Sequence, residues 1–275
     1  MKLGVKQGRL RASTTMKREE FPLTSWREEF FDARKLGLSR IEWLVGYEDV
    51  ITNPLLLEEN LDEIWDIQKE TGITVESATL DYLVESPMHK ENYKSGKRAS
   101  WEIISFLLHG LSRAGIKIAV VPLVAESGNE DESSLNSLRS LLPKLNEIAT
   151  QAEIQIALEC ELSSQKIRTL VESSHDLCNV GFNFDTGNSA SLGNDPKEEI
   201  HMYGEKLINV HLKDRKLKGV SVPLGKGDVD FAHVISLLRS SGYSRNAILE
   251  GARSKSGQNY EQIHDYIRFL EQIGW

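Results

Sequence analysis

The chain has 275 residues, of which 40% are hydrophobic and 27% are charged, and its formal net charge is -8. This composition is ordinary for a globular protein and excludes the disordered and fibrous classes. The negative charge argues against nucleic acid as a partner, and no apolar run is long enough to span a membrane.

Short apolar runs rich in β-branched residues alternate with longer segments of helical periodicity along the chain. The predicted strands are 2–8, 40–45, 73–80, 117–124, 154–160, 180–185, 208–214 and 246–251. The predicted helices are 24–36, 56–70, 98–114, 133–152, 164–173, 196–206, 230–241 and 258–273. Strict alternation predicts parallel strands, because parallel neighbours need long crossover connections. We therefore expect one α/β domain over 1–275, a (β/α)8 TIM barrel.

Local signals support several of these boundaries. Asp195 followed by Pro196 predicts the start of the sixth helix, and Gly72 stands where the second should end. The segment GDVDF (227–231) is expected to turn the chain and cap the seventh helix, and the polar stretch 126–134 is expected to be a loop.

The N-terminal segment carries charges at positions 2, 6, 9 and 11, where a secretory signal would need an uninterrupted apolar run. The two cysteines, Cys160 and Cys178, fit neither a disulfide framework nor a CxxC site. We therefore expect a cytoplasmic protein whose cysteines are reduced and buried.

Four consecutive predicted strands end on side chains that can bind a metal: Glu159, Asp185, His211 and Glu250. Each of these residues taken alone could also be structural. A glutamate could form an ion pair with a lysine, and a histidine could be hydrogen-bonded within the core. The C-terminal ends of barrel strands meet at the active face, so the set indicates a site. Buried carboxylates need a compensating cation, and this donor set favours one divalent ion: Mn2+, Mg2+ or Co2+, with Zn2+ as an alternative.

The segments around these residues resemble the xylose isomerase-like TIM barrel superfamily. Within it they resemble the sugar phosphate isomerases and epimerases, above all the L-ribulose-5-phosphate (L-xylulose-5-phosphate) 3-epimerases. The similar segments are IALE (156–159), DTGNSASLGND (185–195), VHLKD (210–214), VPLGKGDVDF (222–231) and ILEG (248–251), with looser similarity at 3–10 and 41–44. The resemblance implies that the four residues bind the metal and that Glu159 and Glu250 are also acid/base catalysts. It also implies that Asn188 lies near metal and substrate.

The expected function is that of a divalent-metal-dependent epimerase or isomerase of a sugar or sugar phosphate. The first candidate reaction is 3-epimerisation of a ketopentose phosphate through a metal-stabilised enediolate. Glu159 and Glu250 lie three strands apart, so they can approach a substrate from different sides. Aldose–ketose isomerisation needs the same residues and stays open.

Lys213 and Arg215 are candidate substrate contacts in a basic loop after the seventh strand, and Asn188 is a third. Family members that act on free ketohexoses often carry a histidine at the position of Asn188, so the asparagine and the basic loop favour a phosphorylated substrate. A solvated loop without a ligand is the alternative. Glu42 is a fourth candidate substrate contact, and the alternative is that it belongs to a hydrogen-bond network in the core. Glu42 and Trp43 are neighbours on one strand, so their side chains must face opposite sides of the sheet.

Other functions are possible on the same barrel fold. An inosose dehydratase or hydroxypyruvate isomerase would also use a metal and a carboxylate base. An apurinic endonuclease would need several more histidines at strand ends, and a sugar-binding barrel without catalysis would not need both glutamates. The expected partner is a small-molecule sugar or sugar phosphate, and exposed helices would allow a homo-oligomer.

Overall fold

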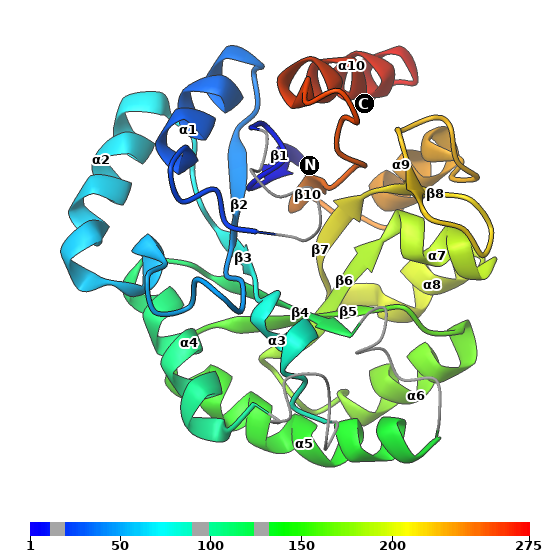
Figure 1. Cartoon of the computed structure of the whole chain (residues 1–275). Coiled ribbons are helices and arrows are strands. Elements are labelled where there is room, and N and C mark those ends of the chain that lie inside the picture. Colours follow the sequence, from blue (N-terminus) through cyan, green and yellow to red (C-terminus); the bar gives the residue numbers. More distant parts are fainter. Residues whose placement is uncertain (12–19, 90–98, 124–131) are drawn as a thin grey trace.

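The computed structural model describes residues 1–11, 20–89, 99–123 and 132–275, and the predicted loop at 126–134 lies mostly outside them. Eight parallel strands form a closed barrel in the order β1-β10-β7-β6-β5-β4-β3-β2 (Figure 1). They are β1 (Lys2–Lys6), β2 (Arg40–Leu44), β3 (Ser77–Thr79), β4 (Ile118–Leu123), β5 (Gln155–Cys160), β6 (Val180–Asp185), β7 (Leu207–Leu212) and β10 (Asn246–Leu249). The predicted barrel is confirmed.

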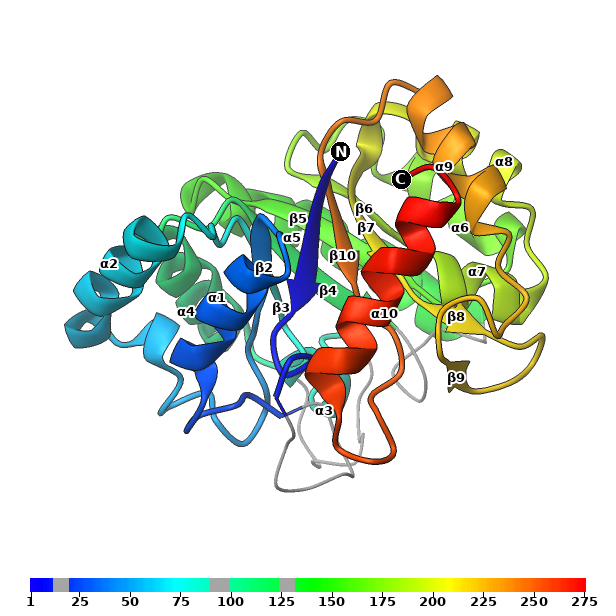
Figure 2. The same cartoon turned by 90° about the horizontal axis from the view of Figure 1, so that it is seen from above.

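Helices alternate with these strands and surround the barrel. The eight that match predicted helices are α1 (Trp26–Lys35), α2 (Leu61–Thr71), α4 (Trp101–Arg113), α5 (Glu132–Gln151), α6 (Ser164–Ser173), α8 (Pro196–Tyr203), α9 (Phe231–Ser240) and α10 (Asn259–Gln272). Both views show the last helix, α10, beside the first strand, β1, so the two ends of the chain lie near each other (Figures 1 and 2).

The connections contain short elements that periodicity did not predict. They are η1 (Pro54–Leu56), η2 (Glu58–Asn60), α3 (Tyr82–Glu85), α7 (Thr186–Leu192), η4 (Gly204–Lys206) and the pair β8 (Asp214–Arg215) and β9 (Ser221–Val222). The predicted seventh strand was too long, because β8 leaves the barrel to pair antiparallel with β9. The third was also too long: Thr74 makes only an isolated bridge to Arg40.

Successive side chains of β2 point alternately to the outside and to the interior of the barrel. Trp43 faces outward and packs against α1, with ring centroids 5.4 Å from Trp26 and 6.4 Å from Phe30. Glu42 faces the barrel interior, where it is fully buried. The two side chains therefore lie on opposite sides, as predicted. A separate apolar cluster consists of Ile118, Val120, Ala157 and Ile208.

The predicted helix starts are confirmed. The carboxylate of Asp195 accepts from the Lys197 N–H at 2.9 Å at the start of α8, and that of Asp230 accepts from the His233 N–H at 3.0 Å at the start of α9. Gly72 ends α2 with φ of 73°, a left-handed conformation that glycine adopts without steric cost.

One sequence expectation about the cysteines is wrong. Cys160 is buried at the end of β5, but Cys178 is exposed. Cys178 lies in the surface turn between α6 and β6, where the chain reverses and no second layer covers it. Across the described residues, no helix is long and apolar enough to cross a membrane.

Candidate active site

The four predicted ligand residues converge at the C-terminal ends of β5, β6, β7 and β10. One ligand atom from each of Glu159, Asp185, His211 and Glu250 lies within 4.8 Å of the other three. The register explains part of this, since Asp185 pairs directly with His211 across β6 and β7. All four side chains are buried. Residues far apart in sequence thus meet because parallel strands present their carboxyl ends on one face.

His211 lies at the centre of the cluster. Its Nδ1 atom lies 2.6 Å from Oε2 of Glu250, 3.4 Å from Oε2 of Glu159 and 4.0 Å from Oδ2 of Asp185. Its other ring nitrogen, Nε2, points away from these carboxylates and lies 2.7 Å from Oε1 of Glu42.

Burial and mutual charge set the protonation of the cluster. Burial raises the pKa of Asp185 to about 6, against the opposing charge of Lys213. Burial also acts to raise the pKa of Glu250, but Lys213, Lys6 and His211 outweigh it and hold that pKa well below its usual range. For His211, burial favours the neutral ring, yet the facing carboxylates raise its pKa well above the usual value.

The ammonium of Lys213 lies among the three carboxylates. Its Nζ atom is 2.8 Å from Oδ2 of Asp185, 3.2 Å from Oε1 of Glu250 and 3.9 Å from Oε1 of Glu159. Lys213 was predicted as a substrate contact from its place after the seventh strand. Its position shows that the carboxylates attract a cation to this point.

The donor atoms fit a divalent cation. Three buried atoms in the cluster, Asp185 Oδ2, Glu250 Oε2 and His211 Nδ1, have charged neighbours at 2.6–2.8 Å, but none makes an aligned hydrogen bond in the described parts of the chain. Buried polar atoms without an aligned hydrogen bond are rare unless an ion, a water or a ligand completes them. Oxygen donors with one imidazole suit Mn2+, Mg2+ or Co2+, and also Zn2+.

A cavity of about 280 Å³ opens beside the cluster, close to the lower end of the size range of small-molecule sites. Its wall includes Glu159, Glu250 and Lys213 from the cluster. The other lining residues come from β1, β4 and the connections that follow β1, β2 and β3: Lys6, Glu20, Gly46, Tyr47, Glu48, Asp49, Asp81, Val84, Glu85 and Pro122. The cavity therefore brings a ligand directly to the two predicted catalytic glutamates.

Asn188 and Arg215 lie behind the cavity wall rather than on it. The Asn188 side-chain amide donates to Oε1 of Glu159 at 3.2 Å, and its carbonyl accepts from Arg215 at 2.9 Å. Arg215 also pairs with Glu161 at 2.7 Å. Neither residue lines the cavity: Asn188 is bonded directly to Glu159, and Arg215 reaches Glu159 only through Asn188.

The other predicted substrate-binding groups, Glu42 and the basic loop, are also bonded to protein groups. Glu42 is fully buried and bonded to protein groups, which matches the core-network alternative. Lys216 of the basic loop pairs with Asp228 at 2.9 Å. Lys213, Arg215 and Lys216 of this loop are therefore each paired with a carboxylate.

Asp81 was missed by the sequence reasoning. It follows β3, lines the cavity and lies 3.2 Å from the Lys6 ammonium, which also contacts Glu250 at 3.3 Å. The signal was present, because the apolar run that contains β3 closes on an acidic residue, as the runs of β5 and β6 do.

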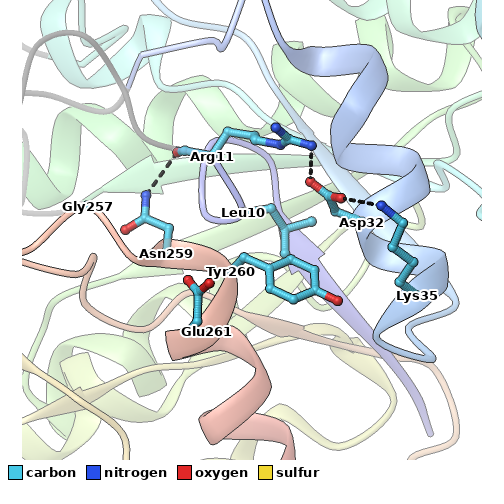
Figure 3. A pocket seen from close by; sticks show the side chains of 8 residues that line it. All are labelled: Leu10, Arg11, Asp32, Lys35, Gly257, Asn259, Tyr260 and Glu261. Carbon is cyan, nitrogen blue, oxygen red and sulfur yellow. Dashed lines mark hydrogen bonds and ion pairs between the residues drawn. The ribbon is translucent and has the colours of Figure 1, made fainter.

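A larger hollow of about 480 Å³ lies away from these residues, between α1 and α10 (Figure 3). Arg11 reaches Asp32 of α1 at 2.5 Å, Lys35 lies 3.3 Å from the same carboxylate, and Asn259 donates to the Arg11 carbonyl at 2.9 Å (Figure 3). These groups satisfy one another, and none of the four clustered residues lines this hollow. The smaller cavity at the strand ends is therefore the candidate active site.

A family model and curated relatives match this chain. A family model described as xylose isomerase-like TIM barrel matches residues 30–273. L-ribulose-5-phosphate 3-epimerase UlaE of Escherichia coli is 27% identical over 237 residues, which cover 82% of this chain and 81% of that protein.

Solved structures share the fold at lower identity. D-allulose 3-epimerase from Methylomonas sp. has a TM-score of 0.74 at 15% identity, over 99% of this chain and 98% of that one. The IOLI protein with a bound zinc atom has a TM-score of 0.73 at 18% identity, over 99% and 96% of the two chains. These likenesses are to the barrel fold, over 99% of this chain.

Proposed function

This chain belongs to the xylose isomerase-like TIM barrel family, and on that basis we propose that it is a divalent-metal-dependent sugar epimerase or isomerase. The observation that carries the proposal is the buried cluster of Glu159, Asp185, His211 and Glu250 beside a cavity of ligand size. The relatives named as sugar epimerases support the same class of reaction.

The four clustered residues would hold one ion: Mn2+, Mg2+, Co2+ or Zn2+. When bound, a divalent ion supplies Lewis acidity, which stabilises negative charge that develops on a substrate oxygen. The buried atoms of Asp185, Glu250 and His211 that lack an aligned hydrogen bond support this assignment.

Glu159 and Glu250 would move the protons. Burial opposes their ionisation, but nearby cations, His211 and Lys213 among them, lower the pKa of both. Each is thus ionised at neutral pH and ready to accept a proton from a carbon beside a ketone. Because β5 and β10 are separated by β6 and β7, the two carboxylates approach the cluster from different sides. One can remove the proton from one face of the carbon and the other return a proton to the opposite face.

Lys6 and Lys213 would orient the sugar. They are the cationic side chains among the described residues that line the cavity. Both ammonium groups lie within 3.3 Å of Glu250 Oε1, next to the reacting groups, where they can donate hydrogen bonds to hydroxyl or phosphate oxygens.

The first candidate substrate is a ketopentose phosphate, with 3-epimerisation as the reaction. The relative that is 27% identical is named as an L-ribulose-5-phosphate 3-epimerase, which supports this choice. Free ketohexoses, inosose and hydroxypyruvate belong in the same test, because the same metal and carboxylates would serve those reactions.

The test is turnover of this panel by the Mn2+-loaded protein in deuterated water. We expect epimerisation of one ketose, with deuterium entering at the carbon that changes configuration. Turnover without label at that carbon would contradict proton transfer to glutamates that exchange with solvent. No turnover of any panel member would contradict the proposed function.

A further inference from the structure

Glu42 is a fully buried carboxylate that belongs to neither the metal cluster nor the cavity wall. It lies on β2 and faces across the barrel interior to β7. Its Oε1 atom accepts from Thr79 at 2.6 Å and contacts His211 Nε2 at 2.7 Å. Its Oε2 atom accepts from Ser77 at 2.8 Å and from Asn209 at 2.9 Å.

These partners determine where the imidazole proton lies. The amide of Asn209 can only donate to Glu42, and the hydroxyls of Ser77 and Thr79 donate to its carboxylate oxygens. A carboxylate surrounded by donors is acceptor-only, so the His211 Nε2 atom must carry the hydrogen in their 2.7 Å contact. In a neutral imidazole the other nitrogen, Nδ1, then has a free lone pair. That atom is the one that faces Glu159, Asp185 and Glu250.

We propose that Glu42 is a positioning residue for the metal centre: it fixes the ring orientation and the Nε2–H tautomer of His211, so that Nδ1 is presented as the ligand atom. Glu42 does not touch the substrate or the ion. The inference rests on the proposed function only through the metal site, because it concerns how that site is assembled. Partners that orient metal-binding histidines in this way typically change metal affinity about 10- to 100-fold when removed.

The hydrogen-bond partners of Glu42 hold its carboxylate in a fixed position against His211. Its donors come from two different strands, Ser77 and Thr79 from β3 and Asn209 from β7. Because Asn209 and His211 are two residues apart on one strand, both side chains face the interior. The carboxylate is thus held by groups that do not depend on the ion.

The experiment compares Glu42→Gln with the wild type and with Asp32→Asn, a control that neutralises another buried carboxylate, on α1, which does not contact His211. Metal-free proteins are titrated with Mn2+ and Co2+ by calorimetry, and the Co2+ absorption spectrum reports the ligand field. We expect Glu42→Gln to bind both ions about 10- to 100-fold more weakly, with an altered Co2+ spectrum. Asp32→Asn should bind them as the wild type does.

Two results would overturn the proposal. One is wild-type metal affinity and an unchanged Co2+ spectrum in Glu42→Gln, whatever its thermal stability, since a purely structural carboxylate would change stability alone. The other needs no substitution: 15N NMR of the wild-type protein with Zn2+ should place the His211 proton on Nε2, and a proton on Nδ1 would refute the assignment. Both readouts are independent of turnover, so a protein that binds metal as expected but epimerises no sugar would contradict the proposed function and leave this inference standing.

Discussion

At the scale of single residues, the stability of the cluster depends on how far nearby cations compensate its buried carboxylates. Three carboxylates and a histidine are removed from water, which is costly unless cations compensate them. Lys213 supplies one such cation in contact with all three carboxylates. A divalent ion bound by the same atoms would supply a second source of positive charge.

Replacing Lys213 tests this balance. Lys213→Met should lower the free energy of unfolding of the metal-free protein by about 3–5 kcal/mol, because it leaves buried carboxylates without their partner. The loss should be smaller with saturating Mn2+, which would provide the missing charge. Urea unfolding in EDTA and in Mn2+ measures both values.

The matched control is Lys216→Met, which removes an exposed lysine paired with Asp228. Exposed pairs contribute about 0–1 kcal/mol, so this variant should stay close to the wild type. Equal destabilisation of Lys213→Met with and without Mn2+ would contradict the idea that lysine and ion neutralise the same carboxylates.

The two glutamates differ from the other cluster residues in their expected effect on turnover. Glu159→Gln and Glu250→Gln should each reduce kcat about 10²- to 10⁴-fold, because a positioned general base is lost. Steady-state kinetics checks this, and Mn2+ calorimetry establishes that each variant still binds metal. Glu261→Gln, at the hollow between α1 and α10, should leave kcat unchanged. A similar fall in that variant would point to a general effect of charge removal.

At the scale of elements, α8 is joined to the α7 segment by a buried glutamate. Glu199 accepts from the Ser189 hydroxyl and, at 2.8 Å, from the Asn194 amide. Because α7 begins directly after Asp185 and carries Asn188, this contact supports the segment behind the candidate site.

The protonation of Glu199 predicts a pH dependence of stability. Burial raises its pKa from 4.5 to about 7, so the folded protein binds this proton more tightly than the unfolded chain. Between these values the folded state holds more protons, and the free energy of unfolding therefore falls as pH rises through the interval. The full loss is about 3 kcal/mol and is nearly complete at about pH 8, and Glu199→Gln should remove it.

Urea unfolding at pH 5 and pH 8 tests this sign. The variant should gain stability relative to the wild type on going from pH 5 to pH 8, by about 2–3 kcal/mol. Glu29, whose pKa burial also raises to about 7, is present in both proteins and cancels in the comparison. A difference between the two proteins that does not change with pH would refute the assignment.

At the scale of the whole molecule, the polar interior connects opposite walls of the barrel. Glu42 on β2 contacts His211 on β7, and Lys6 on β1 contacts Glu250 after β10. The proposed metal centre therefore depends on closure of the barrel, so an ion bound there should stabilise the folded state as a whole.

Metal binding should be visible in global unfolding. Mn2+ at about 100 times its Kd should raise the free energy of unfolding by about 2.7 kcal/mol, since the unfolded chain has no preformed site. Calorimetric Tm measured against Mn2+ concentration checks this. His211→Ala should show the same rise only at higher Mn2+, and an identical response of both proteins would mean that the ion binds elsewhere.

The periodicity of the sequence was sufficient to predict the barrel, its strands and the four clustered residues. Alternating strand and helix patterns report local burial, and a carboxylate or histidine at the end of an apolar run has few structural roles. Asp195 and Asp230 were predictable as helix caps for the same reason, because a cap depends on the few residues beside it.

Only the tertiary structure decided which way the remaining polar groups face and what they touch. Asn188 and Arg215 contact protein groups behind the wall, Lys213 lies among the carboxylates, and Glu42 reaches His211 across the barrel. The Glu42–His211 contact joins residues 169 positions apart. Sequence spacing carries no information on such a contact, because it exists only once the closed barrel brings β2 and β7 to face each other across its interior.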